Sequence, residues 1–156
     1  MLKVLQDEHR RNFRDLLSTA SAVRRAKVRG EIPALGPAHL LHFYAAEVGL
    51  KYLLNKTAKI PFRHETTKKA EDVEGFSHGI AKMIARLKVP AARVPAPPKA
   101  DYRCVPGFND GSGGQRFLLC DAHQAWRYGL VIEATDEIDL TGYIEQVTKY
   151  LEGEIA

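Results

Sequence analysis

The stretch PAHLLHFYAAEVGLKYLLNK, residues 37–56, is the most apolar segment of the chain. Its apolar side chains recur at helical spacing, at Leu40, Leu41, Tyr44, Ala45, Val48, Tyr52 and Leu53. One narrow polar line, Glu47, Lys51 and Asn55, runs between them at every fourth position. A helix with so little polar surface is buried on most sides. The segment is therefore predicted to be the central helix of a helical bundle.

A second helical pattern, from Leu2 to about Arg29, precedes this segment and ends at Gly30. Its apolar stripe consists of Phe13, Leu16, Leu17, Ala20 and Val23. Its other face is basic, and Asp15 is the one acid among Arg10, Arg11, Arg14, Arg24, Arg25, Lys27 and Arg29. Like charges one turn apart repel each other. This face is either exposed to solvent, or its positive charge is balanced by a bound nucleic acid or acidic protein.

Three helical patterns follow the central segment. FSHGIAKMIARL, residues 76–87, is predicted to start at Ser77 as N-cap and to end before Pro90. DAHQAWRYG, residues 121–129, predicts a short helix between Asp121 and Gly129. The last pattern, DLTGYIEQVTKYLEGEIA, is predicted to start at Asp139 and to dock through its apolar face.

Residues 89–114 form a long Pro- and Gly-rich excursion that cannot be helical in its first half, because proline lacks the N–H donor and fixes φ. For DYRCVPGFNDGSGGQRFLL, residues 101–119, two outcomes stay open: a short β-hairpin, or a helix started by a capping box of Ser112 and Gln115. The fold class predicted overall is all-α, an antiparallel bundle of four to five helices.

Length and composition predict a single domain over residues 1–156, with 45% hydrophobic and 27% charged residues. No apolar run approaches the roughly 20 residues of a membrane span, and the charged N-terminus lacks the apolar core of a secretory signal. We expect a cytoplasmic protein, with no membrane partner and with Cys104 and Cys120 as reduced thiols.

The net charge of +4 hides an asymmetry. The first 100 residues carry 19 Lys and Arg against 9 Asp and Glu, whereas the remainder carries 4 against 10. A basic first part raises the expectation of a polyanionic partner. If the acidic last helix packs beside the basic first one, that attraction largely cancels.

Two groups of residues could carry chemistry. His39 and His42, spaced i, i+3 with Glu47 further along, could bind a metal, but such a site needs a third ligand that the sequence does not locate, and we expect neither metal nor cofactor. The second group lies near the start of the short helix and comprises Arg116, Cys120, His123, Trp126, Arg127 and Tyr128. An imidazole can move a proton while a guanidinium binds a phosphate. Trp126 is expected to fill the core, with its indole N–H on a carbonyl.

Three features together resemble the HEPN domain superfamily, a group of small helical bundles. These features are YAAEVGLKYLLNK, then FSHGIAKMIARL, and then an arginine and a histidine before a final amphipathic helix. The resemblance covers roughly residues 10–153, with residues 89–115 as an insertion. Many HEPN domains are metal-independent ribonucleases of toxin–antitoxin and phage-defence systems, whose active sites combine residues of two protomers.

The resemblance implies a homodimer and two alternative functions. In the first, Arg116 and His123, with six residues between them, cleave RNA, His123 as general acid/base and Arg116 as phosphate clamp. In the second, the chain is a non-catalytic module that binds RNA, a nucleotide or a partner protein. Phe117 favours the second, because the family usually has a polar residue after the arginine. The predicted nucleic-acid contacts are Arg10, Arg11, Arg14, Arg24, Arg25 and Arg127.

Overall fold

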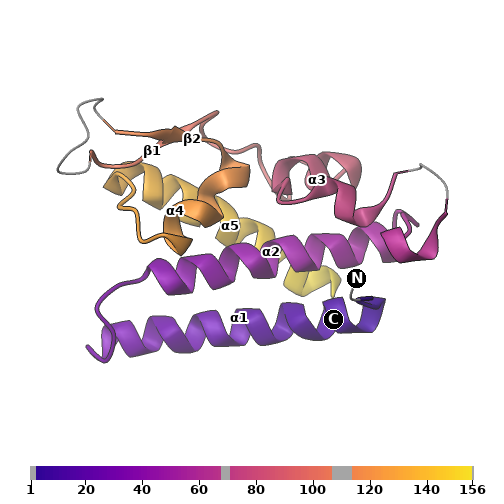
Figure 1. The fold of residues 1–156 in the computed structure, drawn as a ribbon, viewed down its shortest axis with the longest axis horizontal. Coiled ribbons are helices and arrows are strands. Elements are labelled where there is room, and N and C mark those ends of the chain that lie inside the picture. The colour runs from indigo at the N-terminus through magenta and orange to yellow at the C-terminus, as the bar shows by residue number, and fades with distance from the viewer. Residues whose placement is uncertain (1–2, 68–70, 107–113, 156) are drawn as a thin grey trace.

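The computed structural model describes residues 3–67, 71–106 and 114–155. In Figure 1 the long helices lie lengthwise, with the short helices and a small pair of strands on one side of them. The helices are α1 (Gln6–Val28), α2 (Gly36–Lys56), α3 (Ile80–Arg86), α4 (Ala122–Arg127) and α5 (Ala134–Glu154). The strands are β1 (Tyr102–Arg103) and β2 (Arg116–Phe117). The prediction of a helical bundle is confirmed at the level of fold class.

Helix α2 is central, as its composition predicts, and packs against each of the other helices. Helix α1 runs antiparallel to it, since Gln6 Nε2 donates to Asn55 Oδ1 at one end and Arg24 lies on His42 at the other. Helix α5 instead runs in the same direction as α2. Its first turn lies beside His39, and Leu151 near its end lies against Gly49. The antiparallel order therefore holds for α1 and α2 but not for α5.

The core forms where α2 meets its neighbours. Its largest fully buried side chains are Phe43, Leu50, Leu54, Phe62, Ile80, Met83, Tyr102, Leu140, Ile144 and Leu151. Trp126 is also buried, as expected, but its indole N–H has no acceptor among the described residues. Among the described helices, none is long and apolar enough to cross a bilayer.

Two predicted helix starts are wrong. Ser77 does not cap a helix: a 3₁₀ turn capped by Asp72 occupies Val73–Phe76, and α3 begins only at Ile80. Asp139 does not cap α5, which already begins at Ala134. The Asp139 carboxylate instead lies 3.3 Å from the ammonium of Lys99. The described residues form five helices, within the predicted four to five, but α3 spans only 7 residues and α4 only 6.

The Pro-rich segment packs onto the bundle. Val94 is buried, and Asp136 accepts hydrogen bonds from the Lys99 ammonium and, at 2.7 Å, from the Arg103 backbone N–H. Strands β1 and β2 pair antiparallel, which confirms the hairpin. Gln115 starts no helix, because its carbonyl accepts from Cys104 N–H beside this pair. Ser112, the other half of the proposed capping box, lies outside the described residues.

Candidate functional site

The polar line of α2 leads to a buried carboxylate. The Glu47 side chain is 9% exposed, and both of its oxygens are bound. Lys51 Nζ lies 2.6 Å from Oε1, and His78 Nδ1 lies 2.7 Å from Oε2. Since an ionised carboxylate only accepts, Nδ1 of His78 carries the proton in this contact. We call Glu47, Lys51, His78 and His123 the Glu47 cluster.

A tight turn places His78 over Glu47. Gly79 N–H donates to the Phe76 carbonyl at 2.9 Å, and Ser77, the first central residue, has φ 49° and ψ −122°. This is the geometry of a type II′ turn, whose first central position favours glycine. A serine here is strained, and such strain clusters at functional sites. The turn leaves the His78 side chain 40% exposed, so it is the accessible imidazole of the Glu47 cluster.

His123, at the start of α4, lies against His78. The two ring centroids are 4.0 Å apart and the ring planes meet at 38°. His123 is only 5% exposed, and its Nδ1 lies 2.9 Å from the Cys120 carbonyl, to which it donates. Burial, and then the nearby His78, lower the pKa of His123. His123 is therefore neutral at neutral pH. In both rings Nδ1 is engaged, and no hydrogen bond between described residues involves Nε2 of either ring.

This arrangement suits proton transfer. A carboxylate on Nδ1–H fixes the tautomer of an imidazole and stabilises the charge that the ring gains when Nε2 takes a proton. The Glu47 cluster can thus accept a proton at an accessible nitrogen and return it.

Arg116 is not part of the Glu47 cluster. It lies on β2 with its side chain 62% exposed, 3.6 Å from the Asp101 carboxylate. A 3₁₀ turn, Leu119–Asp121, separates β2 from the helix that carries His123. No hydrogen bond, ion pair or ring contact between described residues joins Arg116 to His123.

The basic face of α1 is partly engaged by α5. Arg24 binds Glu145 at 2.9 Å and His42 Nδ1 at 3.0 Å, and Arg14 donates to the Ile155 carbonyl. Arg10 is half-buried, whereas Arg11 and Arg25 are exposed. Arg127 is exposed on α4, with its guanidinium over the Tyr128 ring. The acidic last helix therefore neutralises part of the positive charge of α1, at Arg24.

The ring nitrogens of His42, the second histidine of the His39–His42 pair, are not free to bind a metal ion. Both ring nitrogens of His42 are engaged, since Nδ1 accepts from Arg24 and Nε2 donates to Thr148 Oγ1 at 3.1 Å. Burial and the Arg24 charge lower the pKa of His42, which favours this neutral form. In the described part of the chain, no three His, Cys, Asp or Glu side chains gather closely enough to hold a metal ion.

Sequence reasoning missed Glu47, Lys51 and His78 as site residues. Two signals were present: a charged pair within an otherwise apolar helix, and a histidine beside a glycine in FSHG. A buried charge needs a partner, and that requirement points from Glu47 to a second segment. What the sequence does not show is the strained turn that makes His78 this partner.

Comparison with protein-family models, with curated proteins and with solved structures gave no match for this chain. The resemblance to HEPN domains therefore stays a prediction.

Proposed function

We propose that the protein is a metal-independent, HEPN-like ribonuclease in which His78, rather than Arg116 with His123, moves the proton. One observation carries this proposal: an accessible imidazole is held by the buried Glu47 carboxylate and packed on a second, neutral imidazole. Cleavage of RNA by its own 2′-hydroxyl needs a group that takes one proton and delivers another, and imidazole titrates in the right range.

In the proposed reaction His78 Nε2 takes the proton of a ribose 2′-OH. The 2′-oxygen attacks the adjacent phosphorus, and the bond to the 5′-oxygen breaks. Glu47 stabilises the imidazolium formed, which then gives its proton to the leaving oxygen. Since burial keeps His123 neutral, His123 adds no charge that would oppose protonation of His78.

A cleavage assay with a fluorogenic RNA in the presence of EDTA tests the proposal. We expect His78→Ala and Glu47→Gln to lower the rate by about 100-fold or more, the usual contribution of a general acid/base. His64→Ala is the matched control, because His64 stacks on Phe62 and has no contact with the Glu47 cluster among the described residues. Absence of cleavage by the unmodified protein, or equal cleavage by His78→Ala, contradicts the proposal.

The resemblance also implies a homodimer, in which Arg116 of one protomer could approach His78 of the other. Mixing Arg116→Ala with His78→Ala protein tests this arrangement. If two inactive variants regain cleavage on mixing, the site is composite; if Arg116→Ala alone is fully active, the arginine has no part in it.

A second candidate function is that of a non-catalytic module for RNA, a nucleotide or a partner protein, including one in prokaryotic defence or toxin–antitoxin systems. The ion pair of Arg116 with Asp101, away from the Glu47 cluster, favours it. Retention of RNA that falls steeply with salt, without cleavage, would support this function. Arg11→Ala with Arg25→Ala should then weaken retention, since both arginines are exposed.

A further inference from the structure

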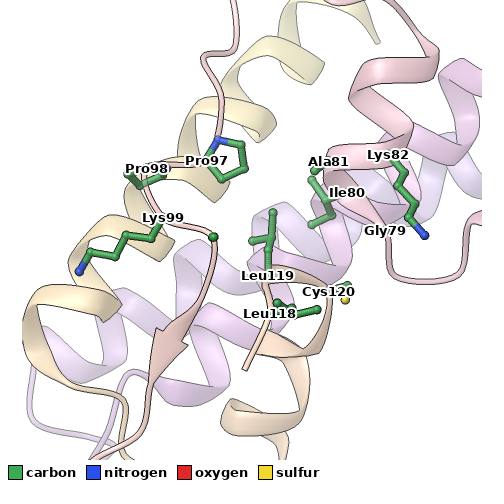
Figure 2. A pocket seen from close by; sticks show the side chains of 11 residues that line it. Gly79, Ile80, Ala81, Lys82, Pro97, Pro98, Lys99, Leu118, Leu119 and Cys120 are labelled. Atoms are coloured by element: carbon green, nitrogen blue, oxygen red, sulfur yellow. The ribbon is translucent and has the colours of Figure 1, made fainter. Parts of the chain in front are cut away.

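An apolar groove lies next to the Glu47 cluster. Its volume is about 470 Å³, within the range of small-molecule sites. Figure 2 shows Pro97 and Pro98 on one side, Ile80 and Ala81 of α3 on the other, and Leu119 between them. Lys99 extends away from the groove toward Asp136 and Asp139. The walls therefore offer flat hydrocarbon surface.

Two lining residues connect the groove to the Glu47 cluster. Gly79 directly follows His78, and the Cys120 carbonyl is the acceptor for His123 Nδ1. A molecule in the groove thus lies against Gly79 and Cys120, the residues through which the groove adjoins His78 and His123. A side chain at position 79 would crowd the part of the groove next to His78, because a Cβ there would lie 2.9 Å from the Phe76 carbonyl and 3.4 Å from Lys82 Cδ.

The charge beside the groove suits an anion. The Lys82 stem lies over Gly79, and within the described residues its ammonium has no hydrogen bond or ion pair to a carboxylate. Nucleotides combine an apolar, flat base with an adjacent phosphate. Proteins that hold an unpaired base place it between aromatic or apolar side chains.

We propose that this groove receives the unpaired base of the nucleotide beside the scissile phosphate, with Lys82 on that phosphate, so that the substrate class is single-stranded RNA. This inference rests on the proposed function of the Glu47 cluster. A base within a duplex is stacked and paired, and would have to leave the helix to enter the groove.

Binding can be measured apart from cleavage with a short fluorescein-labelled 2′-O-methyl RNA, which lacks the attacking hydroxyl. By fluorescence anisotropy, we expect the single strand to bind at least about tenfold more tightly than the same sequence in a duplex. Ala100→Trp, which fills the groove from its exposed rim, should weaken single-strand binding about tenfold, and Lys82→Gln should weaken it as well. The controls Ala92→Trp and Lys149→Gln, at exposed positions outside the groove, should have no effect.

Alkylation of Cys120 by iodoacetamide gives a second measurement. The single strand should protect this half-buried thiol, while buried Cys104 serves as the slow internal reference in the same peptide map. Equal binding of the duplex, or unchanged alkylation of Cys120, overturns the inference. If cleavage depends on His78 but is unchanged in Ala100→Trp, the groove is not the base-binding site, whereas the proposed role of His78 stands. Protection of Cys120 without any cleavage supports the groove and overturns the proposed catalysis.

Discussion

Glu47 is a buried carboxylate whose oxygens are bound by Lys51 and His78. In Glu47→Gln the amide keeps the shape but cannot accept two charge-assisted hydrogen bonds, so Lys51 loses its counter-charge. We expect the free energy of unfolding to fall by about 1.5–3 kcal/mol, as measured by urea denaturation. Glu145→Gln is the matched control, because Glu145 is 51% exposed and its ion pair with Arg24 is worth less than about 1 kcal/mol. Equal losses in the two variants would contradict this account of Glu47.

Ser77 has a backbone conformation that suits glycine better than serine. Ser77→Gly should relieve backbone strain of about 1–3 kcal/mol, but glycine also makes the unfolded chain more flexible, which opposes folding. The net result should be a free energy of unfolding raised by about 0.5–1 kcal/mol. Ser77→Val should lower it, since a β-branched side chain tolerates positive φ poorly. Thermal unfolding of the three proteins ranks them, and a less stable Ser77→Gly protein would show that the turn is unstrained.

At the residue scale the sequence shows the polar line of α2 but does not identify it as part of a site, which the sequence places near the short helix at Arg116 and His123. The line of Glu47, Lys51 and Asn55 is visible in the spacing. The contact of Glu47 with His78 depends on the turn at Ser77. The sequence of residues 76–87 predicts a helix capped by Ser77 instead of this turn. His123 is identifiable as an imidazole but not as a buried one.

At the scale of elements, Gly49 sets how closely three helices approach. A Cβ at this position would lie 2.8 Å from Leu151 Cδ1 of α5 and 2.9 Å from Phe13 Cδ2 of α1. Gly49→Ala should therefore overpack the junction and lower the free energy of unfolding by about 1–3 kcal/mol. Gly142→Ala, inside α5 with nothing within 4 Å, should instead raise it by about 0.5–1 kcal/mol. Stabilisation by both would show that α1 and α5 can move apart at no cost.

Helix α2 was predictable because burial on most sides leaves a strong compositional signal. The start of α5 was not, because Asp139 looks like a cap yet its carboxylate binds Lys99 of the Pro-rich segment. The direction of α5 could not be predicted either. It depends on the path by which the chain returns from the end of α2 to the Leu35 end of that helix, and the spacing of apolar residues does not specify this path.

At the scale of the molecule, four histidines give stability a pH dependence. Burial is the largest influence lowering the pKa of His9, His39, His42 and His123. Below their ordinary pKa near 6.5 the unfolded chain then binds more protons than the folded one, so stability falls as the pH drops from about 7 to 5. Urea midpoints across this range should show the fall, and His42→Gln should flatten it. A constant midpoint would mean that these rings take up protons as readily in the folded protein as in the unfolded chain, so that burial does not lower their pKa.

The parallel arrangement of α2 and α5 affects how the protein is made. On the ribosome, α1 and α2 can pair as a helical hairpin soon after they emerge, since their contacts are close in sequence. Helix α2 still lacks part of its cover at that moment, because Trp126, which packs on Phe43, and Leu151, which lies against Gly49, are synthesised about 80 to 100 residues later. At translation rates of about 5–20 residues per second, this apolar surface stays uncovered for several seconds. We therefore expect the nascent chain to expose apolar surface of the kind that chaperones bind until α5 is synthesised.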